Sequence, residues 1–529
     1  MRIWLLGAAA WLAVSLSGCG SRPSEAPTTA QTLVYGRGGD AQTLDPIHTD
    51  IGESVKVMVN LYDTLVAYDD ATTALVPGLA TEWTNSDDGL QWTLKLRQDV
   101  TFHDGTKFDA DAVVFTFERL LADQHPHVHH PARPYQQSYV SIESVTAVDP
   151  QTVVFKLKHP NPIFLDNLAM FPASIVSPAA VKQQGKAYGE HPVGTGPFKF
   201  VQWQRDQSIT LAANDDHWRG PPGVDRVIFL KVSDNSTRAQ QLLRGESHIA
   251  EDLSFTELDT LAKTPGFVVQ ETQGLNVCYL TMQMEADTPL KHAEVRRAIW
   301  HAIDKQALIN IAYGGKAEPA VNICPKGMSG HNDELVDREF DVAKAKAMLE
   351  ACAAKEGFSL PLELSLASLT EPRPYLPQPL VTASFIKDSL AKIGIRVTVE
   401  PRDVNRHFTH VMAGKHQLAL AGWQTDNNDL DNFLFQLLHS DNISEHGNNL
   451  SRYRNAEVDK LLKEGQTEID VEKRMKLYQR AQELIFVDAP TVPLVHAQLR
   501  LAVSDKVKGY HLHPTGLVRL RLAHFGANP

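Results

Sequence analysis

The chain has 529 residues, of which 43% are hydrophobic and 22% charged, as in an ordinary soluble globular protein. That length is too great for one hydrophobic core, so two or three lobes are expected. The formal net charge of −12 repels phosphate backbones, which makes nucleic acid a poor partner.

The N-terminus has the pattern of an export signal. Arg2 precedes an apolar stretch over residues 3–16, which is short for a permanent transmembrane helix and fits a signal peptide over residues 1–18. The stretch ends in Leu-Ser-Gly-Cys, which resembles a bacterial lipobox, so we expect Cys19 to be lipidated. Residues 19–31 then form the lipidated cysteine and a flexible tether rich in Ser, Pro and Thr. An uncleaved anchor and a plain secretory signal are the alternatives.

After Cys19 no segment could span a membrane, so the rest of the chain is expected to be soluble. The export signal and the lipobox predict a location on the periplasmic or cell-envelope side, with the lipid as the only membrane anchor. Three further cysteines, Cys278, Cys324 and Cys352, lack any C-x-x-C spacing, which disfavours a zinc knuckle or a thioredoxin-like motif. Cys278 lies in an apolar run and is predicted to be a buried thiol. Export also permits a disulfide between two of these three, and the sequence leaves that open.

The first half of the chain is rich in strands and turns. Strands are predicted over residues 32–37, 90–96 and 152–157, and a hairpin over 198–203 and 208–212. The turn at residues 87–89 precedes the second strand. Residues 110–121 have the apolar spacing of a helix, with Asp109 and Asp111 near its start, where acidic side chains suit the helix dipole.

The second half alternates between helices and strands. Helices are predicted over residues 294–311, 342–354, 379–393, 457–464 and 471–487, and strands over 360–367, 396–401 and 416–423. Such alternation favours an α/β lobe with a largely parallel sheet.

Six sequence blocks occur in a familiar order. Residues 79–105 and 111–119 form the first block, followed by residues 192–198, 217–220, 274–277, 295–298 and 303–305. Together they resemble the bacterial peptide/nickel-type extracellular solute-binding proteins, family 5, over about residues 32–524. The resemblance is closest to the dipeptide-binding and Sap-type peptide-binding lipoproteins of ABC importers.

The resemblance implies a periplasmic-binding-protein-like α/β fold with two lobes, a hinge and an inserted smaller subdomain. Lobe I is expected to comprise residues 32–64, 195–273 and 501–529, with residues 65–194 inserted as the subdomain. Lobe II is expected over residues 274–500, and the hinge crossings near Gln273 and Arg500. The ligand should close the lobes over itself, and an ABC permease with ATPase subunits should recognise the closed form.

Two segments match the residues by which dipeptide-binding relatives hold a ligand. Arg373, in Arg-Pro-Tyr-Leu-Pro, matches the arginine that takes the ligand carboxylate, and Asp426 matches the aspartate that takes its α-ammonium group. The chemistry is reasonable, because a buried zwitterion needs both charges paired and arginine grips a carboxylate with two hydrogen bonds. The alternative is that Arg373 is a surface charge and Asp426 a cap or turn residue.

The same segments contain further candidate ligand-binding residues. They are Tyr375, Trp423 and Asn427, and the segment at residues 37–40 adds Gly39 and Asp40. Trp423 is either a cleft wall or ordinary core at the end of a strand. The pair of cysteines that often follows the Asp-rich loop in dipeptide-binding relatives is absent here, so this loop lacks the disulfide of those relatives.

Other candidate sites are weaker. The histidines of residues 125–130 suit zinc, copper or nickel, but two prolines indicate a poorly organised loop and no carboxylate or cysteine completes a ligand set. Residues 426–431 lack the glycine and glutamate of a calcium loop, and residues 194–197 lack the ending of a phosphate loop. There is no G-x-S-x-G and no H-E-x-x-H motif. We therefore expect no metal, no cofactor and no enzymatic activity.

The sequence thus predicts a monomeric substrate-binding lipoprotein that captures short, dipeptide-like peptides for an ABC importer. The same fold binding haem, glutathione, nickel or a longer peptide is the main alternative. A secreted hydrolase or a ligand sensor is the alternative from a different class.

Overall fold

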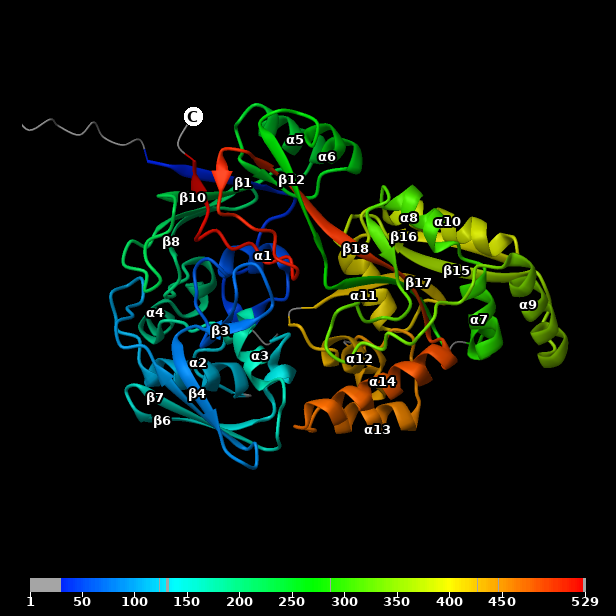
Figure 1. Ribbon diagram of the computed structural model, residues 1–529, viewed down its shortest axis with the longest axis horizontal. Helices are drawn as coiled ribbons and strands as arrows, with labels where there is room; N and C mark the ends of the chain where they lie inside the picture. Colours follow the sequence, from blue (N-terminus) through cyan, green and yellow to red (C-terminus); the bar gives the residue numbers. More distant parts are fainter. Residues whose placement is uncertain are drawn as a thin grey trace, which may run out of the picture.

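The computed structural model describes residues 30–526, apart from residues 123, 130–132, 286, 426 and 446. The expected signal peptide, Cys19 and nearly all of the expected tether lie outside the described residues. The described chain forms two halves that lie side by side, and a long strand, β18 (Thr491–Ser504), runs from one half into the other (Figure 1).

The first half is built on a mixed sheet. It contains β1 (Thr32–Arg37), β8 (Phe198–Gln204), β9 (Ser208–Ala213), β10 (Arg226–Lys231), β11 (Ile249–Ala250) and β12 (Phe267–Gln273). Strand β1 is parallel to both β10 and β11, whereas β8 and β9 form the predicted hairpin. Apolar residues of α1 (Gly52–Met58) and α4 (Pro178–Gln184) join the core of this sheet, and α5 (Asn235–Leu243) and α6 (Phe255–Leu261) share a smaller core.

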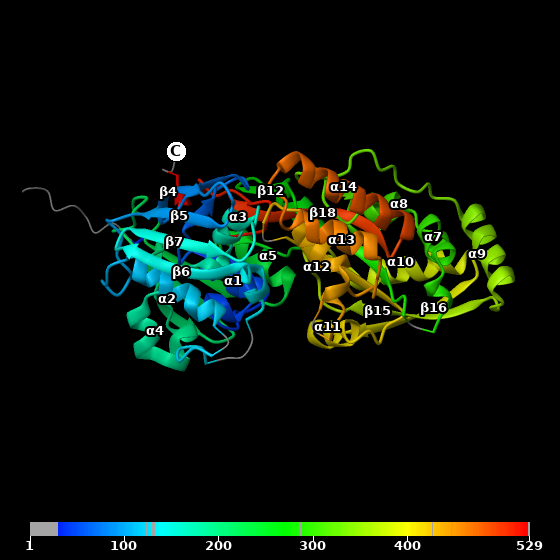
Figure 2. The ribbon, with the colours of Figure 1, turned by 90° about the horizontal axis from the view of Figure 1, so that it is seen from below.

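A separate antiparallel sheet lies between β1 and β8 in the sequence. Its strands, in spatial order, are β4 (Ala80–Asn85), β5 (Gln91–Leu96), β7 (Thr152–Leu157) and β6 (Ile142–Asp149). Helix α2 (Ala110–Leu121) packs on this sheet (Figure 2), and the predicted Asp109 caps it by accepting the Ala112 backbone N–H at 3.1 Å. The small hairpin β2 (Val66–Tyr68) and β3 (Leu75–Pro77) and helix α3 (Phe164–Ala169) complete this part.

The second half has a sheet with helices on both faces. The strands are β13 (Asn276–Met282), β14 (Ala317–Pro319), β15 (Leu362–Leu369), β16 (Ile395–Arg402), β17 (Leu418–Gln424) and the first part of β18. The helices are α7 (Ala293–His301), α8 (Lys305–Ala312), α9 (Val342–Glu356), α10 (Pro379–Ala391), α11 (Val404–Met412), α12 (Asp431–Leu438), α13 (Ala456–Gly465) and α14 (Val471–Asp488).

Two expectations for the second half are wrong in detail. Its sheet is mixed: β15 is parallel to β16 and β17, but β13 is antiparallel to β17 and β18. The helix expected over residues 294–311 is divided into α7 and α8, because Asp304 caps a new helix by accepting the Ala307 N–H at 2.9 Å. Strand β13 lies in the centre of the sheet and is the most deeply buried of its short strands. Its side chains alternate between two hydrophobic cores, one on each face, so every residue of the strand is buried.

Two adjacent segments connect the halves. Strand β12 pairs with the C-terminal part of β18, in a register that ends at Gln273 opposite Gln498. After Gly274 and Leu275 the chain continues as β13, which pairs with the N-terminal part of β18 from Val495 backwards. The halves therefore connect through two neighbouring stretches of extended chain.

The three cysteines within the described part of the chain, Cys278, Cys324 and Cys352, are buried free thiols. Burial raises the pKa of the Cys278 thiol to about 12, which keeps it protonated and unreactive. Within residues 30–526 as described, no helix is both long enough and apolar enough to cross a membrane.

Candidate ligand site between the lobes

Arg373 and Tyr375 lie in the loop between β15 and α10, on the lobe II side of the interface between the halves. The loop is tight, because the backbone N–H groups of Arg373 and Leu376 donate to each other's carbonyl oxygens at 3.0 and 2.9 Å. Tyr375 is buried, and its backbone carbonyl accepts the Tyr313 hydroxyl at 3.0 Å. A Cβ at Gly422 would lie 2.1 Å from the Tyr375 ring. Strand β17 therefore needs glycine here to let this loop approach.

The guanidinium group of Arg373 interacts with Tyr375 in its own half and with the charge of Glu53 in the first half. Burial raises the pKa of Tyr375, and a hydrogen bond from Arg373 opposes that shift. Arg373 also helps to lower the pKa of Glu53, which belongs to α1 in the first half. The Arg373 Nε atom is buried and has no hydrogen-bond partner among the described residues. Arg373 thus brings an incompletely paired cation to the junction of the two lobes.

Gly39 and Asp40 follow β1 on the opposite wall. A Cβ at Gly39 would lie 2.9 Å from Cγ of Glu53, so this turn packs closely on α1. The Asp40 carboxylate accepts four hydrogen bonds, from Arg37 Nη2, Ala41 N, Trp203 Nε1 and Asp206 N, at 2.8–3.0 Å. Asp40 is therefore saturated by protein donors and holds the wall in place.

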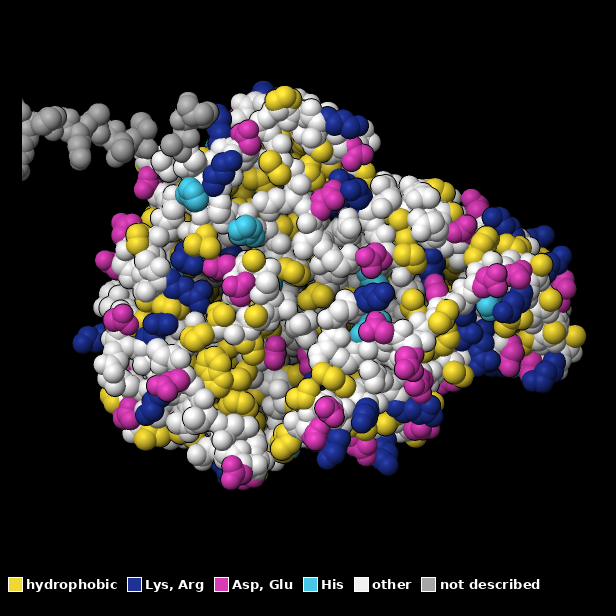
Figure 3. All heavy atoms as spheres, viewed as in Figure 1, with side chains coloured by type: hydrophobic (Ala, Val, Ile, Leu, Met, Phe, Trp, Pro, Cys, Tyr) yellow, Lys and Arg dark blue, Asp and Glu magenta, His cyan; other side chains and the backbone are white. Residues whose placement is uncertain are grey.

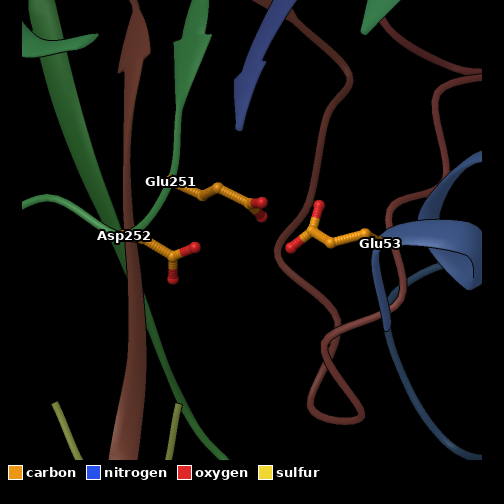
Figure 4. A group of neighbouring side chains, drawn as sticks. All are labelled: Glu53, Glu251 and Asp252. Atoms are coloured by element: carbon orange, nitrogen blue, oxygen red, sulfur yellow. The ribbon is translucent and has the colours of Figure 1, made fainter. Parts of the chain in front are cut away.

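A charge cluster next to these residues was not predicted, and within it Glu251 is buried, Glu53 is partly buried and Asp252 is exposed. Carboxylate oxygens of Glu53, Glu251 and Asp252 lie within 4.8 Å of one another (Figure 4). The Lys56 ammonium group donates to Glu53 at 3.0 Å and to Glu251 at 2.5 Å, and Tyr35 donates to Glu251 at 2.8 Å. Although the three acids have the spacing of a metal site, Lys56 supplies the compensating charge, so the geometry is that of a salt-bridge cluster.

Burial and charge set the protonation of this cluster. Burial raises the pKa of Glu251 to about 7, although the neighbouring Lys56 opposes the shift. Burial also acts to raise the pKa of Glu53, but Lys56 and Arg37 more than offset it, and the pKa is lowered. No sequence pattern could have joined these residues, because Lys56 and Glu251 are 195 positions apart.

The end of β17 and the residues that follow it form another part of the lobe II wall of the interface. Trp423 donates from Nε1 to Asn432 at 2.7 Å and packs against a lobe II core while remaining partly exposed. Asn427 is buried and contacts the Met170 sulfur, from the first half, at 3.7 Å. The predicted ammonium ligand Asp426 lies outside the described residues. The interface thus brings together segments that the sequence places far apart.

A second charged contact between the halves involves Asp166, in α3. Burial raises its pKa to about 7, and the charge of Asp429, from lobe II, adds to the shift. Asp429 itself is held by a bidentate ion pair with Arg474, at 2.6 and 2.7 Å. The closed interface therefore places two carboxyl groups near each other, and with a pKa of about 7 Asp166 is about half protonated at neutral pH.

The lobes are closed onto each other. Besides Asn427 and Met170, the Gln424 side chain donates to the Thr515 carbonyl at 2.5 Å, which joins β17 to the C-terminal segment. In Figure 3 the two halves meet along much of this face. This arrangement, two α/β lobes with connecting strands and charged walls facing across their interface, defines the periplasmic-binding-protein-like class and confirms the fold prediction.

The chain belongs to the bacterial extracellular solute-binding proteins of family 5, whose model, described as the middle region of that family, matches residues 74–445. It is 32% identical to the dipeptide-binding protein of Escherichia coli (strain K12) over 510 residues, which cover 93% of this chain and 94% of the relative. It is also 32% identical to heme-binding protein A of Haemophilus influenzae over 530 residues, covering 95% of each chain.

Among solved structures, the chain resembles the ABC transporter-associated periplasmic binding protein DppA from Helicobacter pylori in complex with the peptide STSA. The TM-score is 0.83 at 32% sequence identity, and the match covers 94% of this chain and 98% of the other. Together these similarities confirm the resemblance to family 5 that the six sequence blocks indicated.

In the histidine-rich loop, the described side chains of His125 and His127 pack on an aromatic ring. The rings of His125 and His127 lie 5.6 Å apart and pack against Phe115, and burial lowers the pKa of both. His130 lies outside the described residues. Among the residues that are described, the side chains spaced closely enough to share an ion are those of Glu53, Glu251 and Asp252.

Proposed function

We propose that this protein captures a short, dipeptide-like peptide between its two lobes and delivers it to the permease of an ABC importer. The observation that carries the proposal is the position of Arg373, a cation with a buried, unpartnered Nε atom at the junction of the lobes. The dipeptide-binding relative and the peptide complex, similar along nearly the whole chain, support the choice of ligand. The protein then acts as a monomeric carrier and not as an enzyme.

In this proposal the ligand carboxylate pairs with Arg373 and the ligand ammonium group with Asp426. A buried zwitterion would otherwise leave two unpaired charges, each costing several kcal/mol. Tyr375 and Asn427 shape the lobe II wall, and Trp423 flanks it. Gly39 contributes close-packed backbone to the opposite wall, supported by Asp40.

The proposed moving units are lobe I (residues 32–64, 195–273 and 501–529) with its subdomain (65–194), and lobe II (274–500). Opening would bend the chain at Gly274 and Leu275 and along β18, where the two connecting segments lie side by side. Export by residues 1–18 and lipidation at Cys19 would hold the protein at the periplasmic side of a membrane, beside the permease and its ATPase subunits.

Calorimetric titration tests the proposed ligand. The purified protein is unfolded and refolded to remove any carried-over ligand, and is then titrated with a dipeptide, a tetrapeptide, glutathione, haem and Ni²⁺. We expect saturable, stoichiometric binding of the dipeptide. If haem or Ni²⁺ binds and no peptide does, the proposed ligand is wrong. If longer peptides bind and dipeptides do not, the proposed ligand length is wrong.

Ligand affinity is expected to fall as the pH rises, because of Asp166. Its pKa of about 7 in the closed form comes first from burial and then from Asp429, across the interface. Opening the lobes removes both causes, so the open-form pKa should return toward its usual value near 4. A carboxyl group whose pKa is raised by closure favours the closed form at low pH and loses that effect as the pH rises through 7.

We therefore expect dipeptide affinity to fall roughly tenfold between pH 5.5 and pH 7.5. The Asp166→Asn variant, which keeps the shape of the side chain and cannot ionise, should show much less pH dependence. Asp431→Asn is the matched control, because its pKa is also about 7 but the groups that shift it belong to lobe II alone. Equal pH dependence in the wild type and in Asp166→Asn would contradict the prediction.

A further inference from the structure

A cavity of about 80 Å³ lies within the first half of the molecule, and its lining includes Ala169 and Phe171, the chain neighbours of the interface residue Met170. The cavity is partly open, and it is lined by the chain after α1, by the hairpin β2–β3, by the end of α3 and by the C-terminal segment. None of its lining residues comes from lobe II. One water needs roughly 10–15 Å³ of such space, so the cavity has room for several waters or a small ligand.

Three arginines line the cavity, namely Arg219, Arg519 and Arg521. The side chains of Arg519 and Arg521 are only 17% and 19% exposed. Burial lowers the pKa of both Arg219 and Arg519. Nearby aspartates oppose this shift, and at least one neighbouring arginine adds to it in each case. The guanidinium groups of these arginines therefore repel one another in a region that water screens only weakly.

The acidic residues nearby compensate for only part of this charge. The Oδ2 atom of Asp63 accepts hydrogen bonds from Thr195 and Trp218, both at 2.9 Å, and lies 3.3 Å from His217. Asp70 lies 2.9 Å from Arg521 and 3.9 Å from Arg519. Asp69 lies near Arg519, and the guanidinium group of Arg97 lies 4.0 Å from the ring of Trp218. This region therefore contains four arginines and three aspartates.

The arginines also have donors to spare. Each guanidinium group has five N–H donors. Arg519 uses Nη1 for the carbonyls of Tyr68 and Asp69, at 2.6 and 3.0 Å, and Arg219 uses Nη2 for the Pro77 carbonyl at 3.0 Å. No other hydrogen bonds link these two guanidinium groups to the described residues, and none of their nitrogen atoms is a buried orphan. The remaining donors are therefore within reach of solvent or of a ligand in the cavity.

From these observations we propose that the cavity is a binding site for a small oxyanion, of phosphate or carboxylate type, held by Arg219, Arg519 and Arg521. Arginine presents paired N–H groups that match the oxygens of such anions, and an anion would neutralise the excess positive charge of the cluster. The net charge of −12 on the whole chain disfavours non-specific anion binding, so selective uptake must come from a local site.

The test is titration of the purified protein with sodium phosphate and, separately, with sodium acetate, against sodium chloride at equal ionic strength. We expect one phosphate or acetate ion per protein and a rise in melting temperature that chloride does not produce. Arg519→Gln should weaken this binding at least tenfold. Arg396→Gln, which alters an exposed arginine paired with Glu363 in lobe II, is the matched control and should bind as the wild type does.

Arg519 also bonds to backbone carbonyls, so Arg219→Gln serves as a second variant if Arg519→Gln fails to fold. Both variants should bind the dipeptide as the wild type does, because the cavity contains no lobe II residue. The two proposals therefore fail separately. No binding of phosphate or acetate, or binding that neither variant weakens, would overturn the oxyanion site.

Discussion

Replacing Arg373 with alanine is expected to weaken dipeptide binding by about 2–5 kcal/mol, the usual cost of removing one partner of a buried charge pair. The variant leaves the ligand carboxylate in the interface between the lobes without its cation. Arg373→Lys keeps the charge but loses the planar pair of donors, so its affinity should lie between those of the wild type and the alanine variant. Calorimetry with a free dipeptide measures both losses.

Two controls make this prediction specific. Arg396→Ala removes an exposed lobe II arginine and should leave affinity unchanged, because exposed ion pairs contribute little. A dipeptide with an amidated C-terminus has no carboxylate to lose, so it should bind the wild type weakly and discriminate little between wild type and Arg373→Ala. If the alanine variant binds the free dipeptide like the wild type, Arg373 is not the carboxylate ligand.

The second large effect is expected at Lys56, in the cluster of Figure 4. Lys56→Met keeps the length and apolar volume of the side chain but leaves Glu53 and Glu251 without the cation that they share, with the exposed Asp252 carboxylate within 4.8 Å of both. Breaking a buried ion pair from one side costs about 3–5 kcal/mol. We expect the free energy of unfolding, from urea titration followed by tryptophan fluorescence, to fall by that amount at pH 8.

The pH dependence of this loss has a defined sign. The pKa of Glu251 is already raised to about 7, first by burial, and removing Lys56 should raise it further. A carboxyl group with a raised folded-state pKa stabilises the fold below its unfolded pKa and loses that contribution as the pH rises through the folded value. The deficit of Lys56→Met relative to the wild type should therefore shrink toward pH 5.5, where Glu251 is protonated.

A compensating change and a control complete the experiment. Adding Glu251→Gln to Lys56→Met removes one of the stranded charges and should recover part of the lost stability, with a coupling energy of about 0.5–3 kcal/mol. Lys346→Met, which disrupts an exposed pair with Glu350, should change stability by less than about 1 kcal/mol. A Lys56→Met variant that unfolds like this control at every pH would show that the cluster does not stabilise the fold.

Local chemistry made much of the architecture predictable. Local periodicity and the residues at the ends of each element predict strand β1, the hairpin β8–β9, helix α2 with its Asp109 cap, and the last helix, α14. The division of the helix expected over residues 294–311 could have been read from Asp304, an N-cap residue in mid-pattern. Strand direction could not be read in this way, because an apolar strand has the same pattern whether its neighbours are parallel or antiparallel.

For this protein, the sequence by itself determined the family, most helices and strands, and the candidate residues Arg373 and Asp426. Each of these can be recognised from a short pattern of neighbouring residues. Only the tertiary structure decided which charges meet. Folding brings together charged residues that are far apart in the sequence: Lys56 with Glu251, Asp166 with Asp429, and Arg219 with Arg519 and Arg521. Burial then changes their pKa values and makes their pairing costly to break, and no local pattern carries that information.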